Sequence, residues 1–157
     1  EELKTSLPIA SLGNLVAQDY LATGLSLKAH PVTILEPYFL VDGWQPCSIA
    51  IDIMDGKKHQ LIGLVTGRQM PGTAKGTVFI TLEDAHYSLN VIVWPAIVRA
   101  YRAALLGSHL LGVSGRIQKQ GKIIHLIADK LVNCDLYLQY LRTPELKMPV
   151  LKSRNFH

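Results

Sequence analysis

Apolar positions follow a helical spacing through the first third of the chain. Between residues 9 and 20 they recur every three or four residues, which predicts a helix that ends before Gly24. A second helix is predicted from Pro31 to about residue 41, because proline fits a first helical turn and Asp42-Gly43 is a turn signal. Residues 47–54 are ambiguous, and a short helix with Ile49, Ile53 and Met54 facing inward is one interpretation.

From residue 60 onward the pattern changes to short, alternating segments that are rich in β-branched residues. These segments predict five strands, at residues 61–69, 77–82, 89–94, 109–117 and 123–128. A single helix is predicted at residues 96–106, between the third and fourth strands. Five strands with a helix at that position is the layout of an OB-fold barrel. We therefore predict an α+β, mainly β fold, with a five-stranded OB-fold barrel, an N-terminal helical segment and an extended C-terminal tail.

These elements divide the 157 residues into three parts. Residues 1–56 form a helical segment that would end a preceding helical domain, and residues 57–131 form an OB-fold nucleic-acid-binding domain. Residues 132–157 form a tail, with a possible short helix near residues 136–141 before Pro144 and Pro149. The chain lacks an initiator methionine, so we expect it to be a fragment of a longer protein.

Charge is distributed unevenly along the chain. The net charge is only +4, but residues 56–130 carry ten Lys and Arg against three Asp and Glu. The remaining residues have a surplus of acids. A basic middle segment favours contact with an anion such as a nucleic-acid backbone, although a solvated basic surface would look the same at this level.

Strand alternation separates a core face from a candidate binding face in the second and third predicted strands. Val78, Ile80 and Leu82 form an all-apolar face, whereas Thr77, Phe79 and Thr81 form a mixed one. Asn90, Ile92 and Trp94 form the matching mixed face of the third strand. OB folds bind single strands on the corresponding face and its two flanking loops. The nucleic-acid-binding residues that we predict are Arg68, Lys75, Phe79, Thr81, Asn90, Trp94, Arg116, Lys119 and Lys122.

Each of these residues has an ordinary structural alternative. Phe79 can equally pack in the core against the end helix, and Trp94, beside Pro95, can simply end a strand. The lysines of the hairpin tips can serve solubility alone. His125 lies in the middle of the fifth predicted strand, and we favour a structural role for it over one in the groove.

The sequence offers little for catalysis, and we predict none in this chain. Two-metal catalysis needs converging carboxylates, whereas the side chains of Glu83-Asp84 diverge at a turn. Cys47 and Cys134 lack the spacing of a zinc site, so we predict two idle thiols, no metal and no cofactor. Residues 71–76 are rich in glycine but lack the spacing of a nucleotide-binding P-loop.

The apolar runs are too short to span a bilayer, and the first residues do not read as a signal peptide. We therefore predict a cytoplasmic protein that has no contact with a membrane and is monomeric as a fragment.

Several segments resemble bacterial C-family DNA polymerases, and in particular their error-prone, ImuC-type branch. The resemblance covers nearly the whole chain. It is carried by residues 19–31, 63–65, 68–69, 71–76, 79, 81–84, 90–95, 115–118 and 153–157. Two departures are Asn155, where the family usually has aspartate, and Ala85-His86-Tyr87, where a glycine-containing turn is commoner.

The resemblance implies the C-terminal region of a polymerase that performs translesion synthesis after DNA damage. It implies a single-stranded DNA template and two partners, an ImuB-like protein related to Y-family polymerases and an ImuA-like protein related to RecA. The catalytic aspartates would lie in a palm domain outside this fragment. Phe79 also resembles the stacking phenylalanine of anticodon-binding OB folds, in which a polar residue at the Asn90 position helps to read a base.

Protein docking is an alternative function to DNA binding. In that interpretation the tail contacts the ImuB-like partner. The partner-binding residues that we predict are Leu136, Leu141, Leu146 and Phe156.

Overall fold

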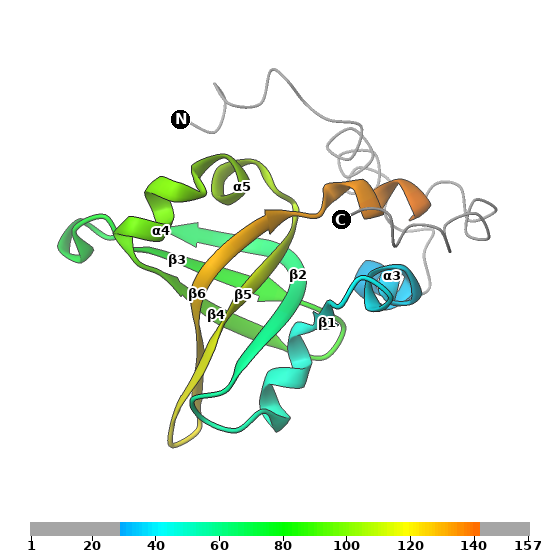
Figure 1. Ribbon diagram of the computed structural model, residues 1–157, viewed down its shortest axis with the longest axis horizontal. Helices are drawn as coiled ribbons and strands as arrows, with labels where there is room; N and C mark the ends of the chain where they lie inside the picture. The colour runs from blue at the N-terminus through cyan, green and yellow to red at the C-terminus, as the bar shows by residue number, and fades with distance from the viewer. Residues whose placement is uncertain (1–28, 142–157) are drawn as a thin grey trace.

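The computed structural model describes residues 29–141 (Figure 1). The helix predicted at residues 9–20 and the tail beyond residue 141, including Leu146 and Phe156, lie outside this range. The described elements in chain order are α3 (Pro31–Leu40), β1 (Gln45–Pro46), η1 (Cys47–Asp52), β2 (Lys58–Gln69), η2 (Gly72–Ala74), β3 (Val78–Glu83), β4 (Ser88–Val93), α4 (Pro95–Ala100), α5 (Arg102–Gly107), β5 (Leu110–Gln120), β6 (Ile123–Asn133) and η3 (Asp135–Leu141).

Five of the strands close into a barrel, which confirms the predicted OB fold. The strand order is β2-β3-β4-β6-β5, and pairing of β5 with β2 closes the ring. Only β4 and β6 run parallel within this ring; the other neighbours are antiparallel. The short β1 pairs in parallel with β2, outside the five-stranded ring.

The barrel interior holds the larger of two apolar clusters. It consists of inward-facing side chains from all five strands, together with residues of η1, α4 and α5. Leu82, Leu89 and Val113 are examples that are completely buried. The apolar alternation of the sequence therefore identifies this core correctly.

A second apolar cluster lies outside the barrel, where α3 and η3 pack together against β2 and β5 (Figure 1). The rings of Tyr38 and Tyr140 stack with centroids 4.6 Å apart. The indole of Trp44 lies over Gly112, where an added Cβ would come within 2.7 Å of the ring. This second cluster therefore covers part of the outer surface of β2 and β5, and it includes no residue of β3, β4 or β6.

The β3–β4 hairpin is fixed by the buried carboxylate of Asp84. Its Oδ1 accepts hydrogen bonds from the backbone N–H groups of His86 and Tyr87, each at 2.9 Å, and its Oδ2 accepts one from Ser48 at 2.8 Å. Burial alone would raise the pKa of Asp84, but hydrogen bonds from the side chain of Ser48 and from the backbone of His86, Ser48 and Tyr87 outweigh it and lower that pKa below its ordinary value.

Three local predictions differ from the structure. The helix expected at residues 96–106 is two short helices, because Tyr101 leaves helical geometry at φ −123°. The last two strands are longer than expected, so that only Gly121 and Lys122 separate them. Residues 47–52 form a 3₁₀ helix, after which the extended backbone of Ile53 turns Met54 to the outside, where 69% of it is exposed.

Candidate nucleic-acid interface

The outer surface of β3, β4 and β6 carries two rows of side chains that run across the strands. We call this surface the open face. The first row joins Phe79 to Ile92 and Ile92 to Ile127 by backbone register. The second row joins Thr81 to Asn90 and Asn90 to His125. On β5 the first row continues to Arg116 and the second to Gln118.

Phe79 points out of the barrel, in agreement with the alternation of the sequence. Its side chain is 37% exposed, while Val78 and Ile80 beside it are buried. Trp94, which directly follows β4, is 50% exposed. The open face thus offers two aromatic rings to solvent, which is what base stacking requires. Thr77, which the alternation assigns to the mixed face, is instead buried, with only 4% of it exposed.

The second row is polar from end to end. Asn90 and Gln118 are exposed, and Thr81 and His125 are half-buried. His125 therefore lies on the open face and not in the interior of the barrel. The alternation of residues 123–128 is consistent with an outward-facing His125. A lone histidine in a strand is nevertheless more often structural than ligand-binding, so the sequence alone favours a structural role.

The β2–β3 loop lies beside the end of the open face that carries Trp94. An added Cβ at Gly76 would come within 3.6 Å of Pro95, so the loop packs next to the turn into α4. Lys75 is exposed and adopts a left-handed conformation at φ +54°, which is uncommon for a residue with a side chain. Lys75 therefore belongs to a loop that lies near the start of α4, directly after Trp94.

The β5–β6 hairpin carries the other predicted cations. Lys119 donates from Nζ to the carbonyl of Ile51 at 2.8 Å, and Arg116 donates to the carbonyl of Gly56 at 2.7 Å. These two side chains therefore also tie the hairpin to η1 and to the segment that follows it. Lys122 lies exposed at the tip of the hairpin.

The side chain of Arg68 makes hydrogen bonds within the fold. A bulge between Val65 and Gly67 shifts the strand, so that Arg68 lies opposite the inward-facing Ile80. Its guanidinium donates to the carbonyl oxygen of Leu105 at 2.7 Å and to that of Ser108 at the end of α5. Burial lowers the pKa of Arg68. The structure therefore engages two of the Arg68 donors at the end of α5.

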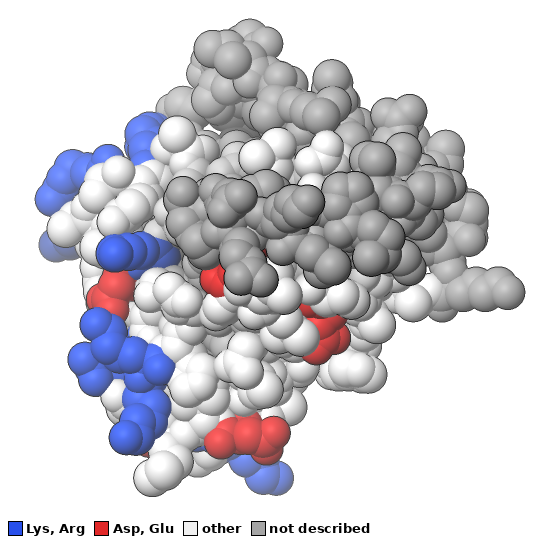
Figure 2. All heavy atoms as spheres, turned by 45° about the vertical axis from the view of Figure 1, so that its right-hand side comes forward, with Lys and Arg blue, Asp and Glu red and all other residues white. Residues whose placement is uncertain are grey.

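Basic side chains gather on the barrel and on the adjoining helices α4 and α5. All Lys and Arg residues of the described range lie between Lys57 and Lys130, and none belongs to α3, η1 or η3. Figure 2 shows these side chains following one another along one edge of the molecule, with few acidic side chains between them. The charge pattern therefore matches an anionic ligand that runs along the barrel.

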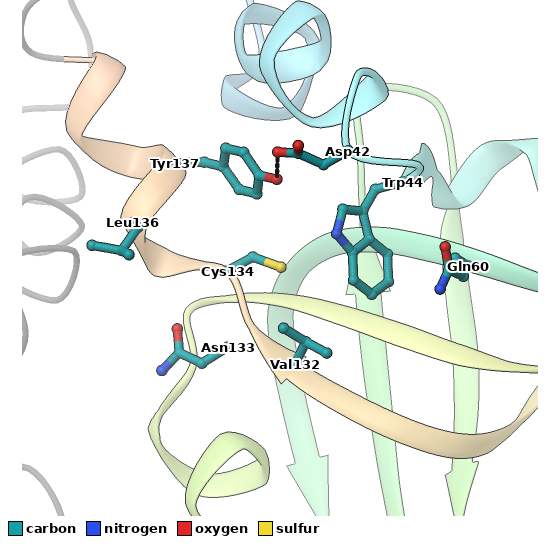
Figure 3. A pocket seen from close by; sticks show the side chains of 8 residues that line it. All are labelled: Asp42, Trp44, Gln60, Val132, Asn133, Cys134, Leu136 and Tyr137. Atoms are coloured by element: carbon teal, nitrogen blue, oxygen red, sulfur yellow. Dashed lines mark hydrogen bonds between the residues drawn. The ribbon is translucent and has the colours of Figure 1, made fainter. Parts of the chain in front are cut away.

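Leu136, a predicted partner-binding residue, lines a groove of about 340 Å³ next to the second apolar cluster (Figure 3). The groove lies between the end of α3, β2, the end of β6 and η3. Its lining residues are Asp42, Trp44, Gln60, Val132, Asn133, Cys134, Leu136 and Tyr137. Val132 is 40% exposed and Leu136 49% exposed, whereas Leu141 packs against the second cluster.

Within residues 29–141 no three His, Cys, Asp or Glu side chains come together in a way that could hold a metal ion. Burial raises the pKa of the Cys134 thiol to about 12 and also raises that of Cys47, so both thiols are protonated near neutral pH. No helix among the described elements has the length and apolar character needed to cross a membrane.

The sequence is similar to segments of error-prone DNA polymerases from several bacteria. The chain is 41% identical over 140 residues to an error-prone DNA polymerase of Vibrio parahaemolyticus, an alignment that covers 89% of this chain and 13% of the relative. It is 42% identical over 148 residues to an error-prone DNA polymerase of Vibrio campbellii, covering 92% and 13%. The chain thus spans about an eighth of the length of these relatives. No protein-family model matches the sequence.

Among solved structures, asparaginyl-tRNA synthetase from Pyrococcus horikoshii is similar with a TM-score of 0.43 and 22% identity. This alignment covers 51% of the present chain and 20% of the synthetase. The OB-fold assignment rests on the strand order and the closed barrel, not on this likeness.

Proposed function

The chain is homologous, over most of its own length, to a segment of the error-prone DNA polymerases, and on this premise we propose that it is a module that binds single-stranded DNA for such a polymerase. The observation that carries the proposal is the open face of the barrel. It combines two exposed aromatic rings, a polar row and flanking cations, which is the combination used by OB folds that bind single strands.

Each part of the open face has a separate task in this proposal. The rings of Phe79 and Trp94 stack on bases, with a contribution of about 1–3 kcal/mol per base. Thr81 and Asn90 hydrogen-bond to the strand. Lys75 and Lys122 attract phosphates from the two loops, while Arg116 and Lys119 add positive charge and hold the hairpin in place. Arg68 is given no contact with DNA in this proposal, because two of its donors hold the carbonyl oxygens of Leu105 and Ser108.

Fluorescence anisotropy with a labelled 15-nucleotide oligonucleotide tests the proposal. We expect salt-dependent binding that Phe79→Ala weakens by about 5- to 150-fold, the equivalent of one stacked base. Leu136→Ala is the matched control, because Leu136 is a similarly exposed apolar residue that lies in the groove and not on the open face. Absence of binding at low salt, or equal effects of the two substitutions, would contradict the proposal.

The function proposed for the parent protein follows from the names of the relatives. We propose that it is a DNA-directed DNA polymerase that synthesises past damaged bases, in DNA repair and damage-induced mutagenesis in the cytoplasm. In this proposal the present segment comes from its C-terminal region and contributes template binding without catalysis. A primer-extension assay on a template with one abasic site tests this, with the expected result that the full-length polymerase extends past the lesion. Arrest at the lesion would contradict it.

A second candidate function is protein docking, and the groove beside Leu136 favours it. Val132, near the end of β6, and Leu136 form an exposed apolar lining outside the two rows of the open face. We propose the ImuB-like partner as the protein that binds there, with the ImuA-like protein in the same complex.

A pull-down with the purified ImuB-like protein tests this second function. We expect Leu136→Glu to abolish capture and Ile123→Glu to leave it unchanged, because Ile123 is equally exposed but lies in the hairpin. Undiminished capture by the Leu136→Glu variant would reject the groove as the docking site.

A further inference from the structure

We infer that β6 supplies a base-contacting residue, His125, and that the polar row Thr81–Asn90–His125–Gln118 contacts the edges of exposed nucleobases. We call it the base-reading row. This inference rests on the proposed function, since it concerns the same open face. It adds a strand and two residues, His125 and Gln118, that neither the sequence nor the comparisons assign to binding.

The backbone register places these four residues in line. Thr81 lies opposite Asn90, Asn90 opposite His125, and His125 opposite Gln118. Neighbouring strands are about 4.8 Å apart, so the row crosses roughly 14 Å of the sheet. This length accommodates a few nucleotides of a strand that crosses the sheet.

On β3, β4 and β6 the row lies beside an apolar row. Phe79, Ile92 and Ile127 occupy positions two residues along the same three strands, which is about 6.7 Å away. A base whose ring covers the apolar row therefore has its polar edge within reach of the neighbouring polar row. With this arrangement the protein can stack on a base and hydrogen-bond to the edge of the same base.

The polar side chains of the row are available for a ligand. No side-chain hydrogen bond of Asn90, His125 or Gln118 to another residue of the described part of the chain is found, and Asn90 and Gln118 are exposed. Amide and imidazole groups can both donate and accept hydrogen bonds. The ligand chemistry that fits is an unpaired base edge, which single-stranded DNA offers and a duplex keeps within base pairs.

Anisotropy with two labelled 15-nucleotide probes tests the inference. One probe has a normal mixed sequence, and the other has the same backbone with abasic residues at its central positions. We expect His125→Ala to weaken binding of the normal probe by about three- to tenfold, as for one lost hydrogen bond. The loss should fall below about twofold with the abasic probe, and the salt dependence should stay unchanged because no phosphate contact is removed.

Two further variants separate a binding role from a folding role. His125→Gln keeps a donor and an acceptor, so it should restore most of the affinity. His86→Ala is the matched control, because His86 is exposed on the β3–β4 turn, and it should bind like the wild type. If Phe79→Ala weakens binding but His125→Ala does not, or if His125→Ala weakens binding of both probes equally, the inference is overturned and the proposed function stands. If the wild-type chain binds neither probe, both are overturned.

Discussion

Replacing Asp84 by asparagine should destabilise the fold in a way that depends on pH. The carboxylate accepts three backbone hydrogen bonds, two at Oδ1 and one at Oδ2, and the residue is only 5% exposed. The asparagine oxygen can keep the two bonds from His86 and Tyr87, but its amide group would then face the N–H of Ser48 donor to donor. Losing one charge-assisted bond and leaving one donor unsatisfied costs about 2–3 kcal/mol at pH 7.

The sign of the pH dependence follows from the lowered pKa of Asp84. In the unfolded chain its pKa is about 3.9, so the stabilisation by the carboxylate is complete above that value. It is lost as the pH falls through the lower pKa of the folded state. The difference in free energy of unfolding between wild type and Asp84→Asn should therefore be largest near pH 7 and should shrink below pH 4.

Urea unfolding followed by tryptophan fluorescence at pH 7, 5 and 3 measures this difference. Glu83→Gln is the control, because the side chain of Glu83 accepts a long hydrogen bond from Ser88, at 3.3 Å near the surface, and no other within residues 29–141. Its effect should stay within about 0.5 kcal/mol. If Asp84→Asn also stays within that range, or if its effect is the same at every pH, our account of the hairpin is refuted.

Three further substitutions or reagents give distinct expectations. Gly115→Ala should lower the free energy of unfolding by about 3 kcal/mol, because its Cβ would lie 2.2 Å from the carbonyl oxygen of Ile127. Gly72→Ala, with open space around it, is the control, and equal urea midpoints for the two variants would contradict this expectation. Arg68→Ala should cost about 1–3 kcal/mol in the same assay but leave oligonucleotide affinity within about twofold, and a large loss of affinity would return Arg68 to the interface. The Cys134 thiol, with its pKa raised to about 12, should react with Ellman's reagent only after unfolding, and rapid reaction of the native chain would contradict its burial.

The sequence predicts the barrel and the direction of Phe79 because both depend on local alternation. Side chains on a strand point alternately to its two sides, so the buried Val78 and Ile80 place Phe79 outside. The helix between β4 and β5 then distinguishes the OB fold from other small barrels. These features need no knowledge of which strands are neighbours.

The features that the sequence does not predict depend on contacts between distant residues. Arg68 faces α5 because of a bulge in β2, and no local sequence pattern predicts that bulge. The second apolar cluster includes Trp44, which covers Gly112, a contact between residues far apart in the chain. His125 joins Asn90 only through the parallel pairing of β4 and β6. A one-dimensional pattern contains none of these pairings.

The most direct measurement of the central claim is a map of backbone amide shifts in the NMR spectrum of the ¹⁵N-labelled chain during titration with single-stranded DNA. We predict that the largest changes fall on β3, β4 and β6, around Phe79, Asn90 and His125, and on the loop that contains Lys75. Changes concentrated on α3, η3 and the groove beside Leu136, with the open face unperturbed, would contradict the account.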